Sequence, residues 1–202
     1  MKHVIGVTVA MALAGGFGVR SVRAQAAQSP ESIIAAAVLP LPEDLRAGAT
    51  VVTYDPASGA RKVLRQGTNA LECQPKNPAD GFTRCYNKAL GPRHDLEAKL
   101  RAEKKSDKEI QDAIAAATKA GTITAPAYGM MSYRLSSDDG RIKRLWVMSV
   151  PNATPESIGV STASQRDAAL KGEGLPWLML PGTPGAHIMI PINNTPLSNT
   201  EN

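Results

Sequence analysis

The sequence predicts an α+β domain in which a mostly antiparallel sheet is built from hairpins and a central helical segment packs on one side. Two observations support this prediction. Segments rich in β-branched residues come in pairs around short turns, before residue 70 and again after residue 126. Between residues 94 and 120 the apolar residues are spaced four apart, as on a helix. Because strand follows strand and does not alternate with helix, an antiparallel sheet is favoured over a parallel one.

The N-terminus has the pattern of a secretory signal peptide. Lys2 precedes an uncharged run over 4–19, and "VRAQA" then places small residues where a signal peptidase cleaves. The run is shorter than the roughly 20 residues that span a membrane. We therefore expect 1–24 to be a cleaved signal peptide, 25–192 to form a single α+β domain and 193–202 to be a flexible tail. No transmembrane segment is expected in the mature chain.

Removal of the leader changes the charge of the chain. The full chain has 23 Lys+Arg against 18 Asp+Glu, a net charge of +5. Cleavage after Ala24 removes Lys2, Arg20 and Arg23 and no acid, which leaves 20 against 18, or +2. A nearly neutral chain with 4% aromatic residues has little to offer phosphate backbones or stacked bases. We therefore expect no nucleic-acid partner.

The first elements after the leader follow from their end signals. Ser29 is suited to cap a helix that begins with Pro30 and cannot pass Pro40. "PEDLRAG" adds one helical turn, which Gly48 ends. "ATVVTYD" and "ARKVLRQG" then predict a hairpin around the turn "PASG".

The central segment predicts two helices, or one helix with a break near Ser106. The apolar pairs on its stripe are Leu96 with Leu100 and Ile110 with Ile114. Between these pairs, Ser106 and Glu109 have the spacing of a capping box, and Gly121 ends the second helix.

Two more hairpins are expected after Pro126. "AYGMMSYRLS" and "RIKRLWVMSV" form the first around "SDDG", and "LPWLML" and "AHIMIPI" form the second around "PGTPG". Between them, "TASQRDAALKGEG" is a short helix or a loop. We interpret Arg134, Arg141 and Lys143 as exposed edge-strand charges that discourage aggregation, with a small basic patch as the alternative.

The two cysteines, Cys73 and Cys85, predict a disulfide. In an exported protein two cysteines at this separation pair most simply with each other, and the residues between them favour turns. Closing a loop of about 13 residues stabilises a fold by roughly 3 kcal/mol in the chain-entropy model. A zinc site, a redox C-x-x-C pair and a catalytic thiol are less consistent with this spacing.

Three segments resemble a family of exported bacterial proteins of unknown function. The family pairs an "R-x-GTN…C" segment with a second cysteine and a C-terminal "GTP-x-AHIMVPV" segment. Here the corresponding stretches are "GTN" (67–69), the two cysteines and "PGTPGAHIMIP" (181–191), with Gly185 where the family has an aromatic residue. The resemblance implies export and a disulfide, and it implies no activity, cofactor or catalytic residue.

His187 is the main candidate for chemistry, because it stands in the otherwise apolar run "LMLPGTPGAHIMIPI". On a strand it would lie opposite Met179, on the face away from the isoleucines, and we interpret it as a packed histidine with one hydrogen bond. One alternative is a metal-dependent or hydrolytic enzyme in which His94 and Asp95 converge on His187. Another is a copper(I) site formed by Met179, Met189 and His187, because thioethers and imidazole suit that ion.

The sequence thus predicts an exported protein, periplasmic or secreted, with a non-catalytic role in binding or in support of the cell envelope. The partner is an unknown ligand or an envelope component, and no cofactor is expected. The alternative is a small metal-dependent or hydrolytic enzyme that uses His187.

Overall fold

The computed structural model describes residues 29–192, so the expected signal peptide and the expected tail lie outside the described residues. In this range the strands form one eight-stranded sheet in the order β2-β1-β3-β4-β5-β6-β8-β7. The strands are β1 (Thr50–Tyr54), β2 (Arg61–Arg65), β3 (Leu71–Gln74), β4 (Thr83–Asn87), β5 (Met131–Leu135), β6 (Arg144–Ser149), β7 (Trp177–Met179) and β8 (His187–Pro191). The helices are α1 (Pro30–Ala37), α2 (Glu43–Arg46), η1 (Lys88–Leu90), α3 (Gly91–Ala102), α4 (Asp107–Lys119), α5 (Pro155–Ile158) and α6 (Arg166–Leu170).

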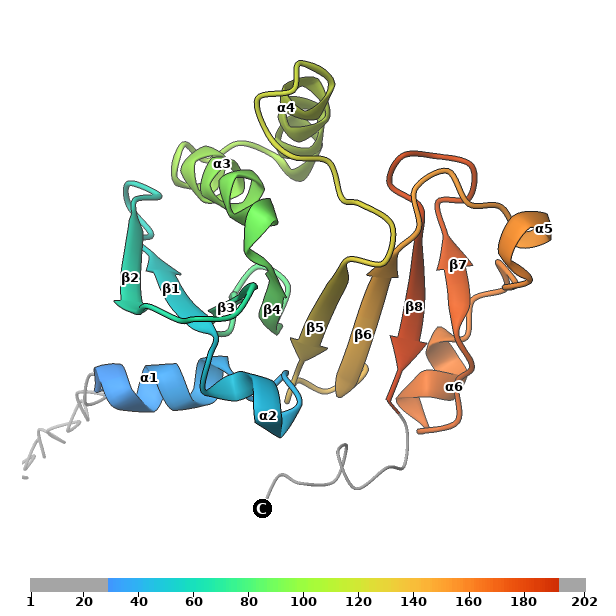
Figure 1. The fold of residues 1–202 in the computed structure, drawn as a ribbon, viewed down its shortest axis with the longest axis horizontal. Helices are drawn as coiled ribbons and strands as arrows, with labels where there is room; N and C mark the ends of the chain where they lie inside the picture. The colour runs from blue at the N-terminus through green and yellow to red at the C-terminus, as the bar shows by residue number, and fades with distance from the viewer. Residues whose placement is uncertain (1–28, 193–202) are drawn as a thin grey trace, which may run out of the picture.

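The predicted fold class is confirmed. Every neighbouring pair of strands in the described sheet is antiparallel except β1 and β3, which run parallel. The three expected hairpins are β1–β2, β5–β6 and β7–β8 (Figure 1). Over residues 29–192 no helix is both long and apolar enough to cross a membrane.

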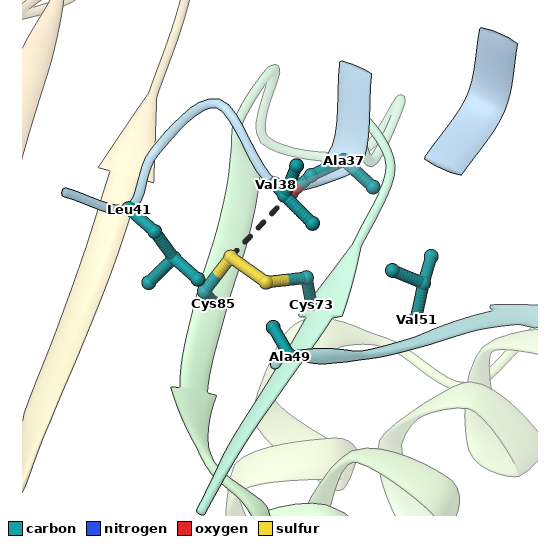
Figure 2. Packing of buried hydrophobic residues seen from close by; sticks show 7 residues of the cluster. All are labelled: Ala37, Val38, Leu41, Ala49, Val51, Cys73 and Cys85. Carbon is teal, nitrogen blue, oxygen red and sulfur yellow. Dashed lines mark hydrogen bonds between the residues drawn. A yellow bond between two sulfur atoms is a disulfide. The ribbon is translucent and has the colours of Figure 1, made fainter. Parts of the chain in front are cut away.

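The N-terminal helix covers one face of the β1–β4 half of the sheet. Ser29 caps α1 by accepting a hydrogen bond from the backbone N–H of Ser32, as the Ser-Pro signal predicts. The end of the helix packs on Val51 and on the disulfide between Cys73 and Cys85 (Figure 2). The two cysteines are directly opposite each other on β3 and β4, so the bridge joins adjacent strands across this buried face.

The helical hairpin α3–α4 lies on the other side of the same strands (Figure 1). The predicted break is confirmed: α3 ends at Ala102, and Ser106 and Glu109 form a capping box at the start of α4. Ile110 and Ile114 of α4 pack on the leucines of α3 rather than on the sheet. The hairpin therefore adds a second layer above the sheet, and α3 is the layer that faces the strands.

The C-terminal half of the sheet is packed with apolar residues on both faces. On one face Leu145, Val147, Trp177 and Met189 pack with Ala169 of α6. On the other face a second cluster contains Val150, Ala153, Leu178, Ala186 and Ile188, with Ile158 of α5 packed against it. The sequence analysis did not identify α5, although Thr154 and Ser157 form a capping box there.

The interpretation of the β5–β6 charges as edge-strand residues is wrong. β5 and β6 are interior strands, and β6 begins only at Arg144, so Arg141 and Lys143 lie in the connection and are exposed. Arg134 is partly buried on β5 directly opposite Arg84 of β4. β5 is an interior strand because it also pairs with β4, whose residues lie about fifty positions earlier in the chain. The sequence signals of a hairpin are local and do not predict such a distant pairing.

Candidate ligand site between the sheet and α3

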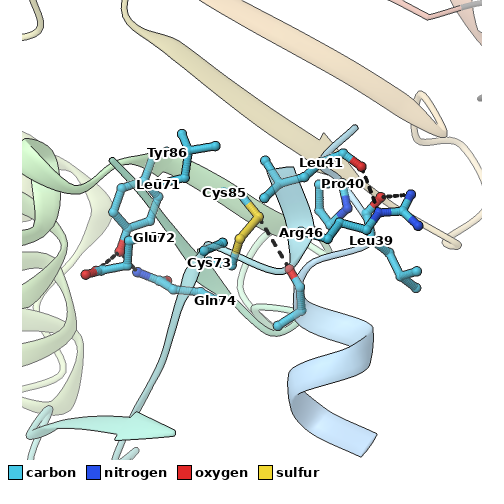
Figure 3. The surroundings of a disulfide bond; sticks show 12 residues. Leu39, Pro40, Leu41, Arg46, Leu71, Glu72, Cys73, Gln74, Cys85 and Tyr86 are labelled. Carbon is cyan, nitrogen blue, oxygen red and sulfur yellow. Dashed lines mark hydrogen bonds between the residues drawn. A yellow bond between two sulfur atoms is a disulfide. The ribbon is translucent and has the colours of Figure 1, made fainter. Parts of the chain in front are cut away.

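A row of polar side chains lies on the face of β3, β4 and β5 opposite to the disulfide. Side chains alternate along a strand, so the residues that flank each cysteine point away from α1. Glu72 and Tyr86 are 2% and 1% exposed, and Gln74 and Arg84 are also buried. Figure 3 shows Glu72 and Gln74 on the side of the strands away from α1. Four buried polar residues on one sheet face are unusual, because burial of such groups requires partners.

Glu72 is the centre of the first group of contacts. The hydroxyl of Tyr86 donates to Glu72 Oε1 at 2.7 Å, and Gln74 Nε2 donates to the same tyrosine oxygen at 2.5 Å (Figure 3). Arg61 of β2 forms an ion pair with Glu72 Oε2. Burial raises the pKa of Tyr86, and the negative charge of Glu72 adds to this effect. The tyrosine therefore stays protonated and acts as a hydrogen-bond donor.

Asp95, at the start of α3, connects the helix to β1 and β2. Its Oδ1 accepts from the Tyr54 hydroxyl at 2.7 Å and lies 3.3 Å from Arg61 Nη1. Burial opposes the charge on Arg61, but the carboxylates of Glu72 and Asp95 outweigh it and raise the pKa of the guanidinium. Arg61 thus bridges the two acids and holds α3 on the sheet.

His94, next to Asp95, and Glu97, one turn later, also face the sheet from α3. The ring of His94 lies on that of Tyr86 with centroids 3.9 Å apart, and its Nδ1 is 3.5 Å from Glu97 Oε2. Burial lowers the pKa of His94, and Glu97 only partly offsets this. The contact from His94, with Arg84 and Arg101 nearby, lowers the pKa of Glu97 to about 2. At neutral pH the pair is therefore a neutral imidazole beside an ionised carboxylate.

Two arginines, Arg84 and Arg134, lie side by side on β4 and β5 and form few hydrogen bonds or ion pairs. Arg84 and Arg134 are directly opposed in the β4–β5 register, which places their Cα atoms about 5 Å apart. Arg84 pairs with Asp80, yet its buried Nε has no hydrogen-bond partner among the described residues. Arg134 lies over the ring of Phe82, 6.0 Å from its centroid, and its Nε is likewise buried without a partner. Burial lowers the pKa of both arginines, for Arg134 to about 10.

A cavity of about 470 Å³ opens beside these residues, between β1, α3 and the loop that follows β3. Its polar lining includes Tyr54, Gln74, Arg84, His94 and Arg101, together with the carboxylates of Asp55 and Glu97 and the ammonium group of Lys76. The apolar lining consists of Pro56, Pro75, Pro78, Ala79, Ala98 and Ala102. A concave site of this size, apolar on one side and with a few converging polar groups, has the features of a small-molecule site.

The structure separates the histidines that the sequence analysis considered together. His94 lies over β4 and His187 is on β8, three strands further along the sheet, which corresponds to about 14 Å. Asp95 is directed to Tyr54 and Arg61. Within residues 29–192 no group of three or more His, Cys, Asp and Glu side chains could hold a metal ion. A site built from His94, Asp95 and His187 is thus not formed.

His187 lies where the strand pattern predicts it. It is directly opposite Met179 in the β7–β8 register and half-buried, and its Nδ1 contacts the carbonyl oxygen of Gly185 at 2.8 Å. The isoleucine face of β8 packs in the cluster beside α5 through Ile188, and the face of His187 is packed as well, through Met189 in the cluster beneath α6.

The "R-x-GTN" segment has a structural role. Arg65 donates to the carbonyl oxygens of Arg46 and Ala49, and Asn69 Nδ2 donates to that of Leu45 at 2.9 Å. A Cβ on Gly67 would lie 2.3 Å from the carbonyl oxygen of Gly48, so only glycine fits there. The segment therefore fastens the α2–β1 connection to the β2–β3 connection, away from any cavity lining.

Apart from His94, the residues of this cavity were not predicted from the sequence, although a signal for them was present. Glu72 immediately precedes Cys73, and Arg84 immediately precedes Cys85. If both cysteines are in strands and face a core, a period of two places Glu72, Gln74, Arg84 and Tyr86 together on the other face. A scan against protein-family models and searches of curated proteins and of solved structures found no match.

Proposed function

We propose that this chain is an exported, non-catalytic binding domain whose cavity under α3 takes a small organic anion. The observation that carries the proposal is Arg84, which lines the cavity and lies directly opposite Arg134 on the next strand. The charge of the buried Arg84 and that of the partly buried Arg134 repel each other across adjacent strands, and the Nε of each arginine lacks a hydrogen-bond acceptor. A bound carboxylate would offset the repulsion and accept charge-assisted hydrogen bonds.

The acids near the arginines offset only part of this charge, although Glu97 attracts both Arg84 and Arg134. Glu97 accepts from Nε and Nη2 of Arg101 at 3.2 and 3.1 Å and also contacts His94, while Asp80 pairs with Arg84 alone. Arg134 has no ion pair within residues 29–192. Arg134 is therefore available to pair with a ligand carboxylate, because Glu97 attracts it without contacting it.

The apolar wall determines which anions fit. Pro75 and Pro78 on one side and Ala98 and Ala102 on the other offer carbon surfaces without hydrogen-bond donors. A ligand with a carboxylate at one end and an apolar body satisfies both parts of the lining. We therefore favour aliphatic or aromatic monocarboxylates over inorganic phosphate.

A binding role is favoured over catalysis by the state of the cavity's carboxylate. Glu97, with a pKa of about 2, is a weak general base at neutral pH. Tyr54 and Tyr86 have raised pKa values and remain protonated. These groups are therefore better suited to orient a bound ligand than to transfer protons to or from it.

The proposal is tested with benzoate and benzamide, which share a ring and differ in charge. Benzoate should shift the NMR signals of the Arg84 Nε–H and of His94, and benzamide should shift them at least fivefold less. Arg84→Gln should remove the benzoate effect, whereas Lys99→Gln, an exposed change on α3 outside the cavity lining, should leave it intact. Equal shifts with benzoate and benzamide would contradict an anion site. So would shifts that are confined to residues away from the cavity, both with benzoate and with hexanoate, an aliphatic carboxylate.

Export is supported by the leader-like N-terminus and by the cysteine pair, and it has a separate test. Cells that express the full chain are fractionated after the free thiols have been alkylated. We expect protein that has lost residues 1–24 and whose two cysteines are unmodified, in the periplasm or the medium. Full-length protein in the cytosol with both thiols alkylated would contradict export.

A further inference from the structure

Four side chains suited to a soft metal ion share one face of the β7–β8 hairpin. The register pairs Met179 with His187 and Trp177 with Met189. Alternation along both strands places all four on the same face, while Leu178 and Ile188 lie on the other face with the α5 cluster. Two thioethers, one imidazole and one indole thus occupy adjacent positions of a two-by-two lattice.

The exposure of these residues leaves the lattice open at one end. Trp177 and Met189 pack with Ala169 of α6, so one side of the lattice is anchored in the apolar cluster. His187 is half-buried, and Met179 is 38% exposed in an edge strand. An ion from solvent can therefore reach Met179 and His187 without opening the core.

His187 is held in the tautomer that a metal requires. A carbonyl oxygen only accepts hydrogen bonds, so the 2.8 Å contact with Gly185 places the proton of the neutral ring on Nδ1. The lone pair is then on Nε2. A backbone carbonyl that fixes the second ring nitrogen is the usual arrangement behind a metal-bound histidine.

The spacing on the strands allows the donor atoms to converge. Directly opposed residues have Cβ atoms about 5 Å apart, and residues two apart on one strand are about 7 Å apart. Methionine has three rotatable side-chain bonds, which lets each sulfur approach an ion bound to the imidazole.

We propose that Met179, His187 and Met189 form a binding site for Cu(I). Thioether and imidazole ligands select this soft ion, and the absence of carboxylates from the set disfavours magnesium, calcium and manganese. Trp177 adds an aromatic ring beside Met189, and aromatic rings attract cations. The site binds the ion without a change in its oxidation state. It is far from the cavity under α3 and does not depend on the function proposed there.

The experiment uses Ag(I), a soft monovalent ion of the same ligand preference that is stable in air. The seven methionines include Met1 and Met11 of the expected leader, so the mature chain carries five methionine methyl signals. One equivalent of Ag(I) should shift the methyl signals of Met179 and Met189 and the ring signals of His187. The signals of Met130, Met131 and Met148 should not move.

Variants separate a specific site from general thioether binding. Met179→Leu should lower the Ag(I) affinity at least tenfold in calorimetry, and because Met179 is exposed this change cannot act by unfolding the chain. Met189→Leu and His187→Gln should have effects of similar size. Met148→Leu, a matched change on the opposite face of β6, should have none. An affinity that is unchanged in Met179→Leu, or equal shifts of all five methyl signals, would overturn the proposal. Competition with a Cu(I) chelator then repeats the comparison with Cu(I) itself under anaerobic conditions.

Discussion

The two halves of the sheet are built differently. In the β1–β4 half one face is apolar and contains the disulfide, while the other face buries Glu72, Tyr86 and Arg84 beneath α3. In the β6–β8 half both faces carry apolar clusters, one beneath α6 and one beside α5. Apolar burial on both faces stabilises a sheet without specific partners, whereas each buried polar group needs a partner. The buried polar groups beneath α3, which we call the polar layer, are Glu72, Gln74, Arg84, Tyr86 and Arg134. The same half of the sheet has the cavity under α3 and the disulfide.

The two halves therefore differ in how their buried groups affect the stability of the fold. The polar layer contains groups that are fully paired, such as Glu72, and groups that are not, such as Arg134. Paired groups cost stability only when a partner is lost, while unpaired groups cost stability as they stand.

Removal of the disulfide should have the largest effect. A Cys73→Ala, Cys85→Ala variant should lose about 3 kcal/mol of unfolding free energy, because the unfolded chain is no longer constrained. Urea unfolding measures the loss, and hydrogen exchange locates it. We expect β3 and β4 to lose protection well before β6 and β8. An equal loss in all strands would show that the two halves unfold as one unit.

Loss of the carboxylate at Glu72 should have the next largest effect. Glu72→Gln keeps the shape and an acceptor for Tyr86 but removes the charge that balances Arg61. We expect a loss of about 2 kcal/mol, less than for a fully buried pair because Arg61 is partly exposed. The matched control is Lys108→Gln, which breaks the exposed pair with Asp112 and should change stability by less than about 0.5 kcal/mol. Similar losses in both variants would mean that the polar layer is no more sensitive than the surface.

The lowered pKa of His94 predicts that the free energy of unfolding depends on pH through a group that packs on the polar layer. Its pKa is lowered from 6.5 by burial, so below pH 6.5 the unfolded chain binds more protons than the folded chain. Stability is therefore full above that pH and should fall by about 1 kcal/mol between pH 7.5 and 5.5. His94→Gln should flatten this slope in urea titrations. A slope that survives the substitution would assign the dependence to another group.

Local elements could be predicted from the sequence because their signals are local. The Ser29 cap, the capping box at Ser106 and the turns of three hairpins all lie within a few residues of the structure they specify. The position of His187 opposite Met179 followed from loop length and a period of two. The cavity could not be predicted in this way. It is formed by β1, β3, β4 and α3, whose mutual placement depends on contacts between distant segments.

The opposed arginines also show why local sequence signals could not predict the site. Arg84 and Arg134 are fifty residues apart, and Arg134 has the sequence context of an exposed strand charge. The pairing of β4 with β5 turns it into a buried charge beside a like charge. The free-energy cost of placing the two like charges together can therefore be recognised only once the strand order is known.

That cost leads to the smallest predicted effect, which has the opposite sign. Arg134→Met removes a partly buried charge that has no ion pair within residues 29–192 and fills a similar volume. We expect the unfolding free energy to rise by about 0.5 kcal/mol, since the gain from removing a desolvated charge and its repulsion by Arg84 exceeds the loss of the contact with Phe82 and of the attraction to Glu97. The same variant should bind benzoate at least fivefold more weakly. A stabilised variant with weakened binding means that this charge is kept for a ligand, whereas a destabilised variant with unchanged binding means that Arg134 supports the fold. Urea unfolding and benzoate titration on the same sample decide between the two.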